Sequence, residues 1–400
     1  VLVALISHRL GAARRYAVFA ALFCLALFAT AARRYVGLDD PQILAQMVFL
    51  AGLYVYVSGR PSWGRLAAVA ALFVVGGNIK HNLVDFPLAV FFDLILTSRR
   101  AAARFVALGA AFLAASIGWE MWAGGPYFIA DLLSARRYFL SHAFVQFMRY
   151  GFEPVEIAFV AAALWSVIQL RSWGQDGGTA AQSGGSRVIA LWFWLALVTG
   201  LSFGGGAGVF YNAYFDLFLA IAVIAALFPQ WALAQLRELG GAARIRAETV
   251  IPLVLLATLL PPAFHRIRFD RFFQLPARQM QWEMEARLIR RQPGPALCEY
   301  TLLCARAGKP FIFDPFNATE RVLTGKLDPA PLLNEVRHGE IGAIQLFAPA
   351  PYFARRTRGN IFPALAQAVS QHYRILLATP HSYIYVPRHT SRAARGSPAG

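Results

Sequence analysis

Long apolar runs recur through the first two thirds of the chain and constrain its fold more than any other feature. Most are roughly 15 to 19 residues long, close to what a helix needs to cross a bilayer. Because 58% of the residues are hydrophobic and 15% are charged, the sequence predicts an all-α polytopic membrane bundle. Two runs, 66–78 and 83–97, are short and carry polar residues, as in half-buried or tilted helices. The predicted spans are 16–32, 43–57, 66–78, 83–97, 105–123, 155–170, 188–203, 213–228 and 249–264.

The basic residues predict an orientation in the membrane. A net charge of +17 would suit a nucleic-acid-binding protein, but the arginines cluster in alternate loops and form no single basic face. If 16–32 runs outward, the cytoplasmic loops hold 13 Lys and Arg, against 6 in the opposite short loops up to residue 212. The positive-inside rule then places the loop "DDPQ" at 39–42, and everything after 264, on the outer side.

The composition changes at about residue 265. Long apolar runs stop, and short strand-like pieces alternate with helical ones, which predicts a small extracytoplasmic α/β domain over 265–387. The tail 388–400 is typical of disorder. The strand-like pieces are "PALCEY", "PFIFDP", "GAIQLFA", "YRILLAT" and "SYIYVP", and the helical ones are "NEVRHG" and "FPALAQAVSQHY".

Two further segments carry expectations of their own. The opening "VLVALIS" before "HRLGAARR" is typical of the last turns of a helix that emerges on the cytoplasmic side, so we expect earlier helices to be missing from this sequence. Residues 171–187 are rich in Gly and Ser and predict a flexible cytoplasmic loop without catalytic residues.

Polar residues at membrane depth or at its outer edge are the candidates for function, because ionisable groups there are costly. The loop order places four such groups on or near the outer face, where they could form one site. They are Asp39, Asp40 and Gln42; Asn78, Lys80, His81, Asn82 and Asp85; Arg136, Arg137 and His142; and Tyr211, Asn212 and Asp216.

The residue types in these groups favour transfer from a lipid-linked phosphate donor. Carboxylates can bind a divalent cation or take a proton from an acceptor hydroxyl, and Lys, Arg and His can hold a phosphate. A sugar that leaves lipid phosphate needs fixed cations at the membrane surface, where the lipid tail stays in the bilayer. A single displacement inverts the anomeric carbon and needs one base.

Purely structural roles compete with these assignments. Asp39 and Asp40 before Pro41 suit a helix N-terminus, which favours an Asp cap and a Pro in the first turn. Lys80 could extend its ammonium group to the interface, although "NIKHN" is denser in donors than that requires. Asp216 could be paired inside the bundle.

The paired arginines also have a structural alternative. Arg136 and Arg137 lie in "GGPYFIADLLSARRYFLSHAFVQF", which is typical of an amphipathic helix on the membrane surface. Basic residues of such helices commonly contact lipid headgroups.

Two of the three cysteines lie in the predicted extracytoplasmic domain, where an oxidising compartment would permit a disulfide. Cys24 lies in an apolar run, whereas Cys298 and Cys304 are six residues apart in the predicted extracytoplasmic domain. A disulfide between them is one open alternative, because the required geometry does not follow from spacing. The sequence has no zinc motif.

The strings "DDPQILA", "KHNLVDFPLAV", "GVFYNAYFDL" and "LCEYTLLCARAGKPFIFDPFN" resemble bacterial membrane glycosyltransferases of the GT-C superfamily, of the dolichyl- or polyprenyl-phosphate-sugar type. The resemblance covers nearly the whole chain. It implies an inner-membrane enzyme that transfers a sugar at the periplasmic face to a lipid, glycan or protein. It also implies that the first outer loop, with the general base, precedes this sequence, and that the DDPQ loop is the second acidic loop.

The resulting assignments are specific enough to test. Asp39 and Asp40 are expected to be catalytic and to hold a divalent cation, Mg²⁺ or Mn²⁺. A transporter or lipid-glycan flippase is the main alternative, although no internal repeat is visible. An assembly protein is a third possibility. The expected phosphate-binding residues are Lys80, His81, Arg136 and Arg137, and the expected substrate-binding residues are Gln42, Asn82, Tyr211 and Asn212.

Overall fold

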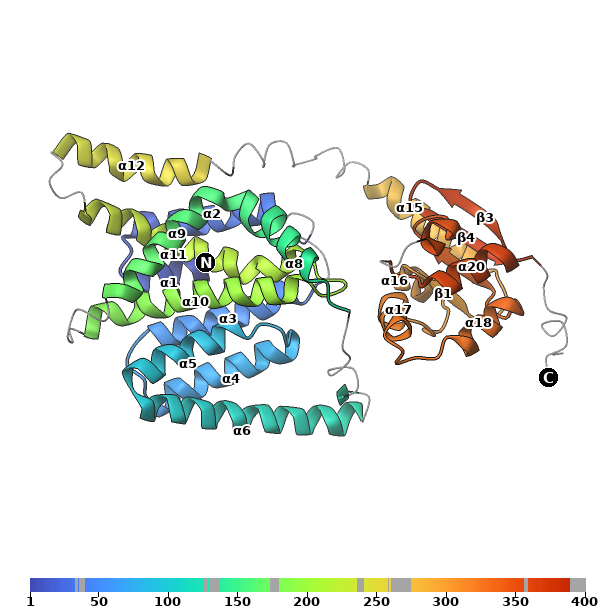
Figure 1. Cartoon of the computed structure of the whole chain (residues 1–400), viewed down its shortest axis with the longest axis horizontal. Coiled ribbons are helices and arrows are strands. Elements are labelled where there is room, and N and C mark those ends of the chain that lie inside the picture. The colour runs from blue at the N-terminus through green and yellow to red at the C-terminus, as the bar shows by residue number, and fades with distance from the viewer. Residues whose placement is uncertain are drawn as a thin grey trace. The chain divides into compact units, whose positions relative to one another are not determined.

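The structure is a computed structural model of the whole chain, shown in Figure 1. It describes residues 1–32, 35, 40–125, 128–129, 137–172, 180–235, 241–257, 259, 275–355 and 359–388. Contacts divide the chain into two units. The first comprises Val1–Leu133 and Phe139–Ile267, and the second Ser134–Tyr138 and Arg268–Gly400.

The first unit is helical throughout the part that the structure describes, as the sequence predicts. Each predicted span overlaps at least one helix, although 249–264 does so only up to Ala257. The helices are α1 Leu2–Arg9, α2 Arg14–Ala31, α3 Gln42–Val57, α4 Trp63–Ile79, α5 Asp85–Thr97, α6 Arg99–Gly124, α8 Leu140–Gln146, η1 Phe147–Phe152, η2 Glu153–Val155, α9 Glu156–Ser172, α10 Ala180–Gly204, η3 Tyr211–Tyr214, α11 Phe215–Gln235 and α12 Gly241–Ala257.

Five helical segments among the described residues are long and apolar enough to cross a membrane. The remaining predicted spans correspond to shorter helices, among them α3, α4 and α5. The long segments are Arg14–Ala31, Arg99–Gly124, Leu140–Ser172, Gly185–Gly204 and Tyr211–Ala234. The prediction of a helical membrane protein is therefore supported by helix length and composition.

Close packing of α3 on α4 depends on two glycines. A Cβ atom at Gly52 of α3 would lie 2.6 Å from the Phe73 ring, and one at Gly76 of α4 would lie 2.6 Å from the Phe49 ring. Each helix therefore places a phenyl ring over a glycine of the other, as small residues permit in membrane bundles. Figure 1 shows α3, α4 and α5 side by side. This packing brings the α4–α5 hairpin close to the start of α3.

The predicted loop 171–187 is partly wrong. Residues 173–179 lie outside the described part of the chain, but α10 begins at Ala180, so 180–187 are helical. Arg187 is 3% exposed and forms an ion pair with Asp93 of α5. A buried partner explains why the helix continues through a Gly- and Ser-containing stretch, since tertiary contacts override weak propensity.

The second unit is a small α/β domain, as the sequence predicts. Its sheet has the order β1-β2-β4-β3, with β1 parallel to β2 and the other neighbours antiparallel. The strands are β1 Ala296–Cys298, β2 Ala343–Leu346, β3 Tyr373–Thr379 and β4 Ser382–Pro387. The helices are α15 Leu275–Arg290, α16 Thr301–Arg306, α17 Pro315–Leu323, α18 Ala330–Arg337, α19 Ala350–Ala354 and α20 Pro363–His372.

Helices cover both faces of this sheet. Leu297, Ile344 and Tyr385 lie on the face that packs against α18, α19 and α20. Cys298 and Ile384 lie on the opposite face, against α15 and α16. The alternation of side chains along each strand produces the two cores.

One predicted strand does not form. The piece "PFIFDP" at 310–315 is a loop that leads into α17, and Phe311 is 72% exposed. Pro310 and Pro315 lack the N–H groups that a sheet ladder requires, which explains the absence of pairing. The predicted tail lies almost entirely outside the described residues, which end at Arg388.

A disulfide joins Cys298 at the end of β1 to Cys304 of α16, with the Cα atoms 5.8 Å apart. Replacing both cysteines by Ser should lower the domain's free energy of unfolding by about 2 kcal/mol, the loop-closure contribution for so short a loop. Denaturant unfolding with and without reductant would measure this. The Cys24→Ser variant is the matched control, because Cys24 is not in a disulfide. Equal stability of oxidised and reduced wild-type protein would contradict the expectation.

Candidate functional site

The start of α3 brings two of the predicted groups together. The Asp40 Oδ1 atom accepts a hydrogen bond from the Gln42 N–H at 2.9 Å, which satisfies one of the free donors of the helix N-terminus. The same oxygen lies 3.6 Å from the Lys80 Nζ atom. Capping and ion pairing therefore coexist at Asp40. Asp39 lies outside the described residues.

The Asp40–Lys80 pair is loosely held. Its separation exceeds the roughly 2.7–2.9 Å of a charge-assisted hydrogen bond. The side chains are 20% and 25% exposed, so water screens the attraction. Among the described residues, none hydrogen-bonds the second Asp40 oxygen, Oδ2. The geometry leaves this oxygen and the ammonium group accessible to other partners.

A ladder of amide and carboxyl groups continues from Asp40 into the bundle. Gln42 exchanges two hydrogen bonds with Asn212, at 2.6 Å to its carbonyl and 2.9 Å from its side-chain Nδ2. One turn further along α3, the Gln46 Nε2 atom donates to Asp216 Oδ1 at 2.8 Å. Both glutamines are 1% exposed. The i, i+4 spacing on each side aligns the two rungs.

A third carboxylate extends this ladder. Asp85 at the start of α5 is fully buried, and its Oδ2 atom accepts a hydrogen bond from Trp192 Nε1 at 3.0 Å. Its Oδ1 atom is buried and has no hydrogen-bond partner among the described residues. Asp216 is paired inside the bundle, as the structural alternative for it proposed, and its hydrogen-bond partner is Gln46 of α3.

Aromatic rings pack against Tyr35 and Tyr211. Tyr35 packs edge-on against Tyr211 at 5.7 Å and Phe215 at 5.2 Å, and Tyr150 contacts Tyr211 at 4.6 Å. Burial, together with the charge of Asp40, raises the pKa of Tyr35 to about 12. Its hydroxyl therefore stays protonated at neutral pH and is a hydrogen-bond donor near the carboxylate.

The tip of the α4–α5 hairpin holds the other residues predicted near Lys80. His81 is exposed, whereas Asn82 is half-buried. The Asn82 Oδ1 atom is buried and accepts no hydrogen bond from the described residues, so it is a free acceptor in this region. Asn78 instead bonds Ser116 of α6 at 2.6 Å.

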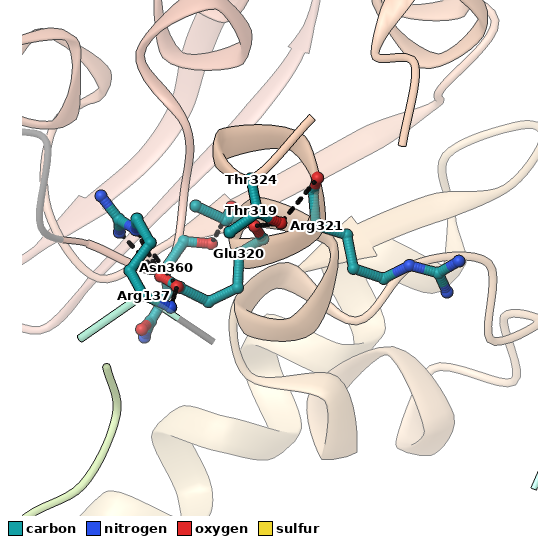
Figure 2. A network of polar contacts seen from close by, with 6 residues as sticks. All are labelled: Arg137, Thr319, Glu320, Arg321, Thr324 and Asn360. Carbon is teal, nitrogen blue, oxygen red and sulfur yellow. Dashed lines mark hydrogen bonds and ion pairs between the residues drawn. The ribbon is translucent and has the colours of Figure 1, made fainter. Parts of the chain in front are cut away.

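Arg137 belongs to the second unit and not to the bundle. Figure 2 shows its side chain at Glu320 of α17, with Nη2 2.7 Å from Oε1 and Nε 3.1 Å from Oε2. The Glu320 side chain is 4% exposed. This bidentate pair gives Arg137 a structural role in the domain, and its predicted phosphate contact stays a prediction. Arg136 lies outside the described residues.

His142 has a local partner on α8. Its Nε2 atom lies 2.7 Å from Gln146 Nε2, and the same amide group is 3.1 Å from the Val209 carbonyl oxygen. Gln146 is 2% exposed. These contacts attach α8 to the turn that precedes Tyr211. Most of the predicted amphipathic helix before α8 lies outside the described residues.

A second polar cluster lies at the other end of α3 and α5. Arg187 Nε donates to Asp93 Oδ1 at 2.6 Å, and the Tyr56 hydroxyl donates to Asp93 Oδ2 at 2.5 Å. Asp93 is 4% exposed. Gln42 and Tyr56 are separated by about 21 Å along α3, at 1.5 Å per residue. The two clusters are therefore distinct.

Several of these residues escaped the sequence interpretation. The missed members are Tyr35, Gln46, Tyr56, Asp93, Tyr150, Arg187 and Trp192. Asp93 and Gln46 had a detectable signal, because each is a lone polar residue within an apolar run. Arg187 was missed because the Gly/Ser-rich stretch before it predicted a flexible loop through this position.

The described residues do not form a metal site. They contain no group of three or more His, Cys, Asp or Glu side chains placed to hold an ion. Asp40 is the carboxylate at the start of α3 that the structure describes, and Lys80 already places a positive charge beside it. Mg²⁺ and Mn²⁺ prefer several oxygen ligands, and Asp39 lies outside the described residues, so the predicted metal site at Asp39 and Asp40 stays a prediction.

Neither a family model nor a curated protein matches this chain. The functional assignment accordingly depends on the geometry of the site and on the resemblance described above.

Proposed function

We propose that the chain is an integral membrane glycosyltransferase that moves a sugar from a polyprenyl-phosphate donor to a lipid, glycan or protein. One observation carries the proposal. Candidate residues from three separate loops form two pairs in the structure. Asp40 pairs with Lys80, and Gln42 pairs with Asn212. Gln42 and Asn212 are 170 positions apart, so the fold and not the local sequence brings these polar residues together.

The proposed reaction is a single displacement. The acceptor oxygen forms a bond to the anomeric carbon while the bond from that carbon to the phosphate oxygen breaks, so the product has the inverted configuration. In place of the first-loop base that the resemblance implies, we assign the acceptor proton to Asp40, whose Oδ2 atom has no hydrogen-bond partner among the described residues. Lys80 neutralises the charge that develops on the departing lipid phosphate.

The surroundings of the pair support these roles. The partly exposed Tyr35 and Tyr150 supply a hydroxyl donor and an apolar ring face for a sugar, and Asn82 and Tyr211 remain predicted substrate contacts. The buried Gln42–Asn212 rung holds α3 to the turn before α11, which positions Asp40. His81, Arg136 and Arg137 remain predicted phosphate contacts.

Lys80→Ala should reduce kcat/KM for the donor by about a hundredfold, since a preorganised charge at the leaving group is removed. Stability should change by less than about 1 kcal/mol, because the ion pair is partly exposed. Steady-state kinetics with varied donor would measure the loss in full-length protein. Lys326→Ala, which removes an exposed lysine of the other unit, is the control. Unchanged donor kinetics in Lys80→Ala would show that Lys80 is an interfacial lysine without a catalytic role.

We also propose that the protein lies in a bacterial inner membrane with its second unit in the periplasm. The disulfide fits an oxidising compartment, and the loop charges fit this orientation. A reporter active only in the periplasm should be active when fused after residue 270 and silent at residue 178. The reverse pattern of reporter activity would place the candidate site on the wrong side for a periplasmic donor.

The buried carboxylates favour one alternative, a transporter. Asp85 and Asp216 are both buried inside the bundle, and buried carboxyl groups in membrane proteins often form proton relays. A transporter would show substrate flux in proteoliposomes that an Asp216→Asn change abolishes, without any labelled transfer product. A glycosyltransferase would give the product without flux.

A further inference from the structure

The second unit contains a cavity of about 850 Å³ that the proposed transfer reaction does not use. Its walls are α15, α16 and the face of the sheet that these helices cover. The volume lies within the roughly 300–1,000 Å³ typical of small-molecule sites. All the residues that line it belong to this unit. The cavity is therefore defined by one domain alone.

Buried polar groups form the base of this cavity. Gln345 is 1% exposed on β2, where its Oε1 atom accepts the Tyr300 N–H at 3.0 Å and its Nε2 atom lies 3.3 Å from Ser382 Oγ. Glu285 of α15 is 2% exposed and accepts a hydrogen bond from Gln281 at 2.8 Å. These hydrogen-bonded side chains lie on a core strand and on the buried face of a helix. They therefore hold polar atoms in fixed positions at the cavity wall.

An aromatic wall stands beside these polar groups. Trp282 and Tyr300 lie 4.9 Å apart, and Tyr300 and Phe347 lie 4.4 Å apart, both pairs edge-on. Tyr300 is 41% exposed although it is in contact with two other rings. Exposed aromatic faces next to fixed polar atoms suit a ligand with one apolar face and many hydroxyls, which describes a sugar ring.

The outer part of the cavity is basic. Arg278 of α15 and Arg306 of α16 line it from two sides, and both are exposed. His381 lines it as well. Two guanidinium groups can bind carboxylates in bidentate fashion. The single lining carboxylate, Glu285, is buried at the base and hydrogen-bonded, so the accessible charge is positive.

The disulfide holds one wall in place. Cys298 ends β1 and Cys304 lies within α16, and the segment between them contains Tyr300 and Leu303, which line the cavity. Arg306 follows two residues later. A closed loop of this size restricts the wall before any ligand arrives, which lowers the entropic cost of binding.

We infer that this cavity is a binding site for a short acidic saccharide, with sugar rings against Tyr300 and Trp282 and carboxylates at Arg278 and Arg306. The inference is independent of the proposed transfer reaction. It requires only the side chains of the second unit. Neutral saccharides can pack on the aromatic wall but leave the two guanidinium groups without a charged partner.

Calorimetric titration of the full chain in nanodiscs tests this, with trigalacturonic acid as the acidic probe and maltotriose as the neutral one. We expect one site for the acidic trisaccharide and at least about tenfold weaker binding of the neutral one, the contribution of charge-assisted hydrogen bonds. Arg278→Gln with Arg306→Gln should remove that preference. Tyr300→Ala should weaken both ligands.

Arg337→Gln is the matched control, because Arg337 is an exposed arginine on α18, on the other face of the sheet. It should bind both probes as the wild type does. The inference is overturned if neither trisaccharide binds, if maltotriose binds as tightly as trigalacturonic acid, or if the double Gln variant keeps the wild-type preference. Binding is measured without a sugar donor, so a failed transfer assay would not affect this result.

Discussion

Asp40→Asn should reduce glycosyl transfer by about two to four orders of magnitude while the bundle stays folded. An Asn side chain accepts the Gln42 N–H about as well as Asp does, so the start of α3 is preserved. It carries no charge to face Lys80 and cannot take a proton from the acceptor. Initial rates with a labelled polyprenyl-phosphate sugar, together with thermal unfolding, would separate the two effects in full-length protein.

The control for this substitution is Asp314→Asn. Asp314 is another Asp whose Oδ1 atom accepts a backbone N–H at a helix N-terminus, that of Asn317 in α17 at 3.0 Å, but it lies in the second unit. Asp39→Asn alone and with Asp40→Asn shows which carboxylate carries the effect. Full transferase activity in the double Asn variant would show that the two carboxylates of the DDPQ loop serve only to cap the helix.

The second large effect concerns stability. Arg187→Met should destabilise the bundle by about 3–5 kcal/mol, because it leaves Asp93 buried without its ion-pair partner. Of the two side chains that contact this carboxylate among the described residues, the Tyr56 hydroxyl would then remain. Denaturant unfolding in detergent, followed by tryptophan fluorescence, would measure the change.

Removal of both charges distinguishes the cost of an unpaired buried charge from the cost of altered packing. In the double variant Arg187→Met with Asp93→Leu, apolar side chains replace the pair, and most of the lost stability should return. Arg171→Met, at the end of α9, is an exposed arginine for comparison. If the single and double variants are equally unstable, the cost arises from packing and not from an unpaired charge.

The helical bundle and the α/β domain were predictable because long apolar runs and strand-like alternation are local patterns. Four of the five predicted strands form, and the exception is bounded by prolines. The helix lengths were harder to predict from the sequence. α3 and α5 have 16 and 13 residues, and the packing of Gly52 and Gly76 against phenyl rings is a tertiary feature.

The site was predictable in its residue types but not in its pairs. Lys80 and Asp40 followed from charge in apolar surroundings, yet their contact depends on how α4 and α5 pack against α3. Arg137 shows the limit most clearly. Its position in a basic pair suggested a phosphate contact, whereas its guanidinium group binds Glu320, 183 residues away. Long-range partners of this kind are set by the fold and not by local sequence.

The most direct test of the proposed function is a transfer assay on proteoliposomes that contain the full-length protein. They would be incubated with radiolabelled polyprenyl-phosphate sugars and a bacterial envelope extract as the acceptor source. We predict a labelled lipid, glycan or protein product that depends on Asp40 and Lys80, with release of polyprenyl phosphate. Release of no polyprenyl phosphate from any donor, or a product formed equally by the Asp40→Asn and Lys80→Ala variants, would contradict the proposal.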